Sequence, residues 1–515
     1  MNTGKQIRFG AVLSYVQMAL GIVIGILYTP VMIRKLGQSE YGLYVTAASI
    51  ISMLSILSLG FGSGYLKFFA KYKAKDDEES ICRLNGLFML IFSIVGIVAL
   101  AIGMFLSFNL QLVYDQGLTA EEYRIAKVLM ILLTLNLALS FPMSVFGTII
   151  SANEKFVFQK IVEIGKTALV PLMTLPLLLC GMKSVAVVSV TVLIALLVDV
   201  ANIIFVFGKL KQKFYFYNFE KGLFKSLFVY TSFILINTIV RQVNWNVDKV
   251  LLGRFQGTVM VAIYGVAATL HTYYETFSTS ISSVFRTRVH MIVNTTELDS
   301  PEQKKALTDL FTRVGRVQFF ILGLIASGLI FFGYDFIVGF WVGAGYEDSY
   351  WVCLLLILPT TIALIQTVGI DVQRALNRHK FRSIAYLIMS VGNVAMTIFL
   401  CQKYGAIGAA IGTAISVFLI DGVVLNIYYQ KRCNLNILAF WGSILRASIG
   451  LIPPCIFGYL INRFLPTNNV VWLYLLKIFA YTVIYVASIW ILSVSKEEKE
   501  KVLNFLRKRK KKPEQ

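Results

Sequence analysis

Long apolar runs alternate with short polar segments along the whole chain of 515 residues. Each run extends over about 18 to 25 residues, enough for one helix to cross a bilayer about 30 Å thick. We count fourteen such runs, and the pattern therefore predicts an all-α polytopic membrane protein with about fourteen transmembrane helices. The expected spans are 12–28, 42–66, 85–108, 128–150, 164–180, 185–207, 227–247, 259–285, 317–336, 351–370, 384–401, 406–428, 442–460 and 471–492.

Composition supports this class, because 57% of the residues are hydrophobic and only 15% are charged, which is too apolar for a soluble protein of this length. The net charge is +21, and many of the basic residues lie in clusters at 67–75, 209–225, 374–382 and 507–512. All of these fall on one side of the membrane if the N-terminus is inside, as the positive-inside rule requires. We therefore expect both termini in the cytoplasm, an uncleaved first helix and no nucleic-acid partner.

The second half of the chain repeats the first. YGLYVTAASI from Tyr41 is similar to YGVAATL from Tyr264, and ANEKF from Ala152 is similar to NRHKF from Asn377. Three such matches at offsets of 222 to 225 predict two six-helix lobes around a central cavity, the third being LLVDV with FLIDG. The expected domains are an N-lobe at 1–208, a cytoplasmic linker at 209–225, a C-lobe at 226–430, two further helices at 431–495 and a basic cytoplasmic tail at 496–515.

A polar stripe interrupts the seventh span. Its members recur at steps of four, three and four residues and so share one helical face: Asn237, Arg241, Asn244 and Asp248. An arginine inside a spanning helix costs about 3 kcal/mol on insertion scales and is tolerated where it faces a wet cavity or a partner. The stripe predicts a cationic cavity that prefers an anionic substrate; pairing of Arg241 with Asp248, or snorkelling to an interface, is the structural alternative.

Other polar positions have both functional and structural interpretations. The eighth span carries His271, Glu275, Ser278 and Ser282 on one face, and Glu275 there is a candidate for proton or sodium coupling or a member of a structural ion pair. His271 and Asp199 are the other coupling candidates. Serine and threonine stripes in the second and fourth spans favour interhelical hydrogen bonds over ligand contact. Asp371 and Arg374 have the spacing of a local pair.

We find no catalytic constellation. GxxxxGK[ST], HExxH and GxSxG are absent from the sequence, the six cysteines form no CxxC, and there are three histidines. We therefore expect no enzymatic activity, no metal site and no cofactor. The energy for transport would come from a proton or sodium gradient or from the substrate gradient.

Several diffuse motifs resemble the oligosaccharide flippases of the multidrug, oligosaccharidyl-lipid and polysaccharide exporter superfamily. They are IRKLGQSEYGLY, ANEKF, NVDKVLLGRFQG followed by AIYGVAATL, and GAIGAAIGTAIS, in this order along the chain. The resemblance implies two lobes that rock about a central cavity in the bacterial inner membrane. It implies translocation of polyprenyl-pyrophosphate-linked repeat units for O-antigen, lipopolysaccharide, capsule or exopolysaccharide assembly, with other polysaccharide-assembly proteins as further partners. We expect a monomer.

A pyrophosphate needs cationic partners, and four residues would supply them: Arg241, Lys249, Arg254 and Arg34. Asn237 and Asn244 would hydrogen-bond sugar hydroxyls. A multidrug exporter of the same superfamily is the alternative, but it predicts an acidic cavity. A membrane-embedded polysaccharide polymerase or glycosyltransferase would need large outer loops, and those expected here are short.

Overall fold

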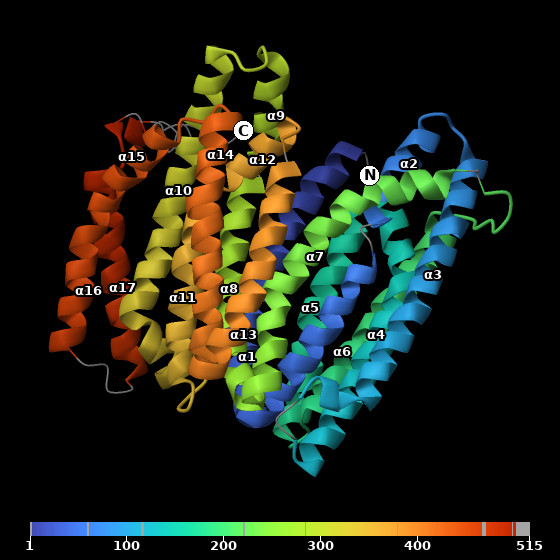
Figure 1. The fold of residues 1–515 in the computed structure, drawn as a ribbon, viewed down its shortest axis with the longest axis horizontal. Coiled ribbons are helices and arrows are strands. Elements are labelled where there is room, and N and C mark those ends of the chain that lie inside the picture. The colour runs from blue at the N-terminus through green and yellow to red at the C-terminus, as the bar shows by residue number, and fades with distance from the viewer. Residues whose placement is uncertain are drawn as a thin grey trace, which may run out of the picture. The chain divides into compact units, whose positions relative to one another are not determined.

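The computed structural model describes residues 3–58, 61–114, 118–219, 222–283, 285–378, 380–465, 470–496 and 498–500. Every regular element in these ranges is helical, which confirms the all-α class (Figure 1). Most of the basic tail expected at 496–515 lies outside the described residues. The α-helices are α1 (Thr3–Leu54), α2 (Phe61–Lys73), α3 (Glu78–Phe108), α4 (Ala120–Ala152), α5 (Phe156–Leu179), α6 (Ser184–Ile204), α7 (Leu223–Gln256), α8 (Thr258–Ser283), α9 (Arg286–Thr295), α10 (Pro301–Tyr334), α11 (Glu347–Leu364), α12 (Thr367–Ala375), α13 (Lys380–Val417), α14 (Leu425–Arg432), α15 (Ile437–Ser448), α16 (Ile452–Phe464) and α17 (Val471–Ser488).

Ten helical segments of the described chain are long and apolar enough to cross a membrane. Two of them, Val12–Lys73 and Lys380–Arg432, each contain two of the predicted spans. Eight others correspond to one predicted span each. The remaining predictions, 227–247 and 259–285, coincide with α7 and α8, which are helical but are not among the ten. The structure thus places a helix at all fourteen predicted positions.

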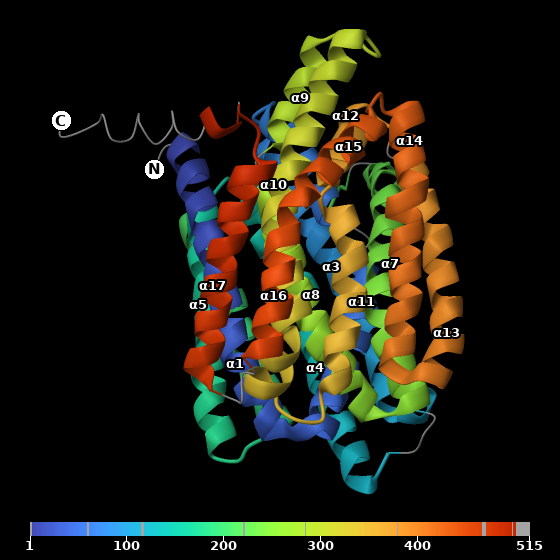
Figure 2. The ribbon, with the colours of Figure 1, turned by 90° about the vertical axis from the view of Figure 1, so that its left-hand side faces the viewer.

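The helices form two compact units. One comprises Met1–Val266 with Tyr386–Thr413, and the other Ala267–Ala385 with Ala414–Gln515. In the first unit, α3 packs on α4, α1 on α5, and α7 on both α1 and α2. In the second, α10 packs on α11, α15, α16 and α17, and α16 lies beside α17 (Figures 1 and 2). The middle of α13 thus belongs to the first unit, whereas the lobe boundaries expected from the sequence remain a prediction.

Aromatic side chains form much of each interior. The first unit contains a cluster in which the Tyr65 ring meets the Phe88 ring edge-on, with centroids 5.1 Å apart. The second contains a smaller cluster in which Tyr481 packs edge-on against Phe332 at 5.3 Å. Edge-to-face pairs of this kind stabilise a core by about 0.5–1.5 kcal/mol beyond the area they bury. These clusters attach α2 to α3 and α17 to α10.

Rare backbone conformations recur at a constant interval and support the duplication. Six of the seven non-glycine residues with positive φ in the described part of the chain form three pairs separated by 223 positions: Asp76 with Asp299, Glu154 with Asn377, and Lys211 with Asn434. Two glycine pairs have similar separations, Gly37 with Gly257 and Gly181 with Gly405. A positive φ is uncommon outside glycine, so chance does not explain this agreement. The two halves use the same sequence of turns.

One local prediction needs correction. The stretch SPEQKKALTDLF predicts a helix start, and Ser300 does cap α10 by accepting a hydrogen bond from the backbone N–H of Gln303 at 3.1 Å. Because this motif lies in the expected cytoplasmic loop 286–316, it predicts a short helix separate from the next span. Instead, α10 continues without a break to Tyr334, because no residue in its first turns interrupts the helical hydrogen bonds.

Candidate functional site

The polar stripe of the seventh predicted span lies on α7. Arg241 is the nineteenth of the 34 residues of this helix, and its side chain is exposed. No ion pair or hydrogen bond within the described part of the chain involves Arg241. A cation facing lipid at this depth costs about 3 kcal/mol or more, so the exposed guanidinium requires water or an anionic partner. The middle of α7 therefore presents an available positive charge.

Asp248 lies two turns further along the same face, but its surroundings are different. Its side chain is buried, and three hydroxyl groups donate to it. Tyr264 Oη and Thr413 Oγ1 each bond Oδ2 at 2.7 Å, and Thr397 Oγ1 bonds Oδ1 at 3.0 Å. These donors come from α8 and α13, which cover the last turns of α7. The carboxylate is satisfied by hydroxyls rather than by Arg241.

A second polar contact joins α7 to the end of α1. Gln242 donates from Nε2 to Ser55 Oγ at 2.7 Å, and its Oε1 accepts a bond from Asn246 Nδ2 at 2.7 Å. Ser52 Oγ lies 3.4 Å from the same Oε1. Ser52 and Ser55 of the second predicted span therefore form interhelical hydrogen bonds, as their spacing indicates, whereas Ser49 bonds a carbonyl of its own helix. Within the described residues, the stripe of the fourth predicted span does not form the expected interhelical bonds, because its hydroxyls bond carbonyls one turn back on their own helix.

The other substrate-binding candidates differ in exposure. Arg34 and Arg254 are exposed, and the Arg254 guanidinium lies 5.8 Å from the centroid of the Phe255 ring. Lys249 and Asn244 are half-buried, and Asn244 Oδ1 is buried without a hydrogen-bond partner in the described chain. The side chain of Asn237 lies outside the described residues. The structure thus places Arg241 and Asn244 together on α7 as exposed or unsatisfied groups, and their role in binding remains a prediction.

The coupling candidates occupy two helices. His271 is buried on α8, with Nε2 3.1 Å from Thr360 Oγ1 on α11. Ser278 on the same face accepts a bond of 3.0 Å from Gln318, which also donates to Thr367 at 2.9 Å. This face is therefore a hydrogen-bonded contact between helices, while Glu275 is half-buried. Asp199 is half-buried on α6 and interacts electrostatically with Lys166. A role of any of them in ion coupling stays a prediction.

Two ionic contacts were not recognised from the sequence. Glu40 is buried and accepts bonds from Ser184, at 2.8 Å from its N–H and 2.6 Å from its hydroxyl, with Lys183 at 3.3 Å. Asp371 does form the expected local pair with Arg374, at 3.7 Å, but also accepts a bond from Arg286 at 3.1 Å. Glu40 and Arg286 are far from their partners in sequence, so no local spacing reveals these contacts.

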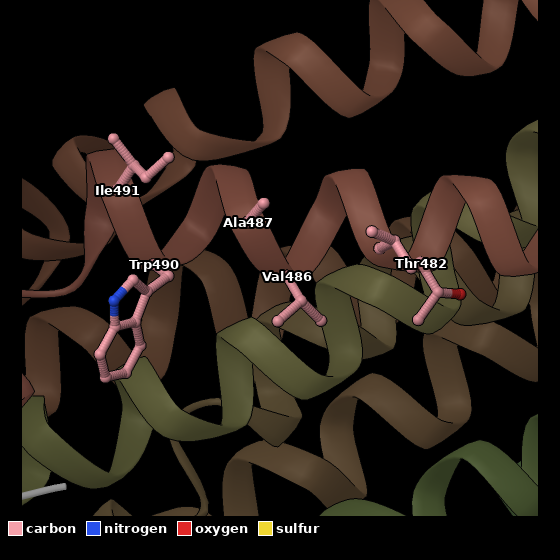
Figure 3. A pocket seen from close by; sticks show the side chains of 6 residues that line it. Thr482, Val486, Ala487, Trp490 and Ile491 are labelled. Atoms are coloured by element: carbon pink, nitrogen blue, oxygen red, sulfur yellow. The ribbon is translucent and has the colours of Figure 1, made fainter. Parts of the chain in front are cut away.

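A recess of about 490 Å³ opens on α17 (Figure 3). Its lining comes from α17 and from the π-helical segment Ile489–Ser493 that follows it: Thr482, Val483, Val486, Ala487, Trp490 and Ile491. Only Thr482 and the indole of Trp490 carry polar atoms here, so the recess lacks the donors that would orient a sugar or a pyrophosphate. It does not compete with α7 as a site for a charged headgroup.

Known proteins resemble this chain in sequence and fold. The sequence profile of the family described as polysaccharide biosynthesis protein matches residues 10–285. A protein named "Putative O-antigen transporter" from Shigella flexneri is 22% identical over 412 residues, covering 78% of this chain and 92% of that protein. The lipid II flippase MurJ in an inward closed conformation superposes with a TM-score of 0.71 at 18% identity, covering 94% of this chain and 98% of that one. An inward-facing multidrug resistance MATE transporter of the MOP superfamily gives 0.62 at 12% identity, covering 82% and 99%.

Proposed function

The chain belongs to the polysaccharide biosynthesis protein family, and from this premise we propose that it translocates polyprenyl-pyrophosphate-linked oligosaccharide repeat units from the inner to the outer leaflet. The bacterial inner membrane would be its location, with both termini in the cytoplasm. The similarity to an O-antigen transporter and the fold shared with a lipid II flippase support this function. Alternating access without covalent chemistry would be the mechanism.

The proposal rests on the environment of Arg241. This arginine is exposed in the middle of α7 and has no partner among the described residues. A planar guanidinium can bind two oxygens of a pyrophosphate through two parallel N–H donors, whereas a lysine ammonium acts as a point charge without this fixed geometry. Asn244 is half-buried one turn away, and its amide would hydrogen-bond a sugar hydroxyl. Arg34, Lys249 and Arg254 would add positive charge along the path.

Replacement of Arg241 tests the proposal. In a strain that lacks its own repeat-unit flippase, the unaltered chain should restore surface polymer. Arg241→Ala should reduce it at least tenfold, since a hydrogen bond to a charged group contributes about 1.5–3 kcal/mol, whereas Arg241→Lys should keep part of it. The matched control is Arg463→Ala on α16, where an exposed arginine is lost elsewhere in the chain. Immunoblots of the membrane fraction should show equal protein levels.

If Arg241→Ala is present at a normal protein level and still restores full polymer, Arg241 has a structural role. The next residues to replace would then be Arg34, Lys249 and Glu275. The fold shared with a multidrug resistance transporter keeps cation export as a second candidate. That function needs an acidic path, which Glu275 and Asp199 would have to provide. If the unaltered chain restores no polymer but lowers the accumulation of a cationic dye, drug export replaces the proposal.

A further inference from the structure

Two arginines and one aspartate meet in the second unit, where α9 packs against α12 (Figure 2). Asp371 has a side chain that is 5% exposed, and its Oδ1 atom is shared by two guanidinium groups. Arg286 on α9 donates to it from Nε at 3.1 Å, and Arg374 Nη1 lies 3.7 Å away. Two cations and one anion leave this contact with a net charge of +1.

The two arginines that contact Asp371 keep most of their donors available. An arginine has five N–H groups in a planar fork that matches the oxygens of a phosphate. Arg286 contacts Asp371 through Nε alone, so both of its terminal NH₂ groups lack a partner among the described residues. The side chains of Arg286 and Arg374 are 55% and 58% exposed. The cluster is therefore anchored on one side and open on the other.

The pKa of the Arg374 guanidinium lies below its usual value. Burial lowers the pKa of the Arg374 guanidinium; Asp371 raises it, and the charges of Arg382 and Arg286 lower it again. An anion bound by the free N–H groups would relieve this repulsion.

Membrane topology alone does not account for this geometry. The positive-inside rule concerns the number of basic residues in a loop and needs no convergence on a buried carboxylate. Arg288, two residues further on α9, needs no explanation beyond the positive-inside rule, because it is exposed and has no partner in the described chain. Arg286 differs since a buried aspartate fixes its guanidinium.

We propose that Arg286 and Arg374, held in place by Asp371, bind the pyrophosphate of the lipid-linked substrate at the membrane face where the substrate enters. This inference rests on the proposed function and on the expected cytoplasmic position of this end of the second unit. A pyrophosphate diester carries two negative charges on two linked phosphates, so its oxygens can accept hydrogen bonds from both guanidinium groups at once. The phosphate of phosphatidylglycerol carries only one charge on one phosphate, so a phospholipid headgroup is the weaker match.

The test is equilibrium binding of a tritiated pyrophosphate diester, geranylgeranyl-pyrophosphoryl-N-acetylglucosamine, to the full-length protein in phosphatidylcholine nanodiscs. Arg286→Ala and Arg374→Ala should each weaken binding about tenfold or more, while the matched control Arg288→Ala should stay within about twofold. Arg374→Ala keeps the 3.1 Å contact of Arg286 with Asp371, so the buried carboxylate retains a partner and the variant should fold. The unaltered protein in nanodiscs that also contain phosphatidylglycerol should bind the probe nearly as tightly as in phosphatidylcholine alone.

Equal binding of the probe by all three variants would overturn the inference. If phosphatidylglycerol displaces the probe as effectively as unlabelled probe does, the cluster is a general phospholipid site and the inference also fails. The polymer assay separates the two proposals. If the unaltered chain restores polymer but probe binding does not depend on Arg286 and Arg374, only the inference fails. If binding depends on both arginines but no polymer returns, the site stands and the proposed function fails.

Discussion

Asp248 and Arg241 share a helical face, but the structure gives them different environments. Periodicity along α7 places both residues correctly, since seven residues are close to two helical turns. Burial depends on what covers each turn, and the groups that cover Asp248 are Thr397 and Thr413, about 150 positions away in the sequence. A single sequence shows the stripe but not which member is enclosed. We therefore interpret Asp248 as a residue that positions α7, and Arg241 as the exposed one.

Removal of the Asp248 carboxylate should destabilise the protein. Asp248→Ala would leave the hydroxyls of Tyr264, Thr397 and Thr413 without their acceptor, and a buried donor left unsatisfied costs about 1–3 kcal/mol. Asp248→Asn retains one acceptor oxygen and a similar volume, so its loss should be smaller. Thermal unfolding of the purified protein in detergent should give the order wild type, Asn, Ala in falling Tm. An unchanged Tm for Asp248→Ala would contradict the enclosed carboxylate.

At the scale of elements, two equivalent glycines make the turns between neighbouring helices of the two halves. Gly37 has φ 76° and ψ 169°, and Gly257 has φ 81° and ψ −177°. This region of backbone space is accessible almost only to glycine. The sequence repeat around Tyr41 and Tyr264 indicates the duplication, yet the agreement in backbone angles explains why each copy has a glycine just before this motif.

Alanine at either glycine should therefore cost about 1–3 kcal/mol of unfolding free energy. The strain would be purely conformational, because an added Cβ would meet no atom within 4 Å at Gly37 or at Gly257. Gly147 inside α4 offers the matched control, since its Cβ would be equally free but its backbone is helical, so Gly147→Ala should be neutral or stabilising by up to about 1 kcal/mol. Chemical denaturation followed by tryptophan fluorescence would compare the three variants. If Gly147→Ala is as unstable as the variants at Gly37 and Gly257, backbone strain does not explain their loss of stability.

For the whole molecule, the sequence predicts which segments are helical better than it predicts which segments associate. Apolar length suffices to locate a spanning helix, because the bilayer sets the length that is needed. The assignment of residues 386–413 to the first unit depends on contacts such as that of Thr397 with Asp248, which no periodicity encodes. The Asp371 cluster illustrates the same limit, since Arg286 reaches its partner across 85 positions.

The two helices beyond the duplication are fastened to the second unit by Arg316 of α10. Its guanidinium contacts Glu498 through Nε at 3.2 Å and Nη2 at 2.9 Å, and also donates to the Ser493 carbonyl at 2.7 Å and to Ser443 Oγ at 3.1 Å. Arg316 thereby joins α10, α15 and the segment that follows α17. A bidentate pair of this kind is stronger than an ordinary surface ion pair, and it holds the end of the described chain in place.

This pair should make stability depend on pH. Burial raises the pKa of Glu498, but hydrogen bonds from the Ser495 N–H and from Arg316 outweigh it, and the pKa lies below its usual value. The stabilisation is therefore complete above the unfolded pKa of about 4.3 and is lost as the pH falls through the folded value. Since Glu498 is partly exposed, Glu498→Gln should cost only about 1 kcal/mol at pH 7. Glu500→Gln, an exposed neighbour, is the control. In unfolding curves at several pH values, the gap between Glu498→Gln and wild type should close in acid, and a gap independent of pH would assign the loss to packing instead of charge.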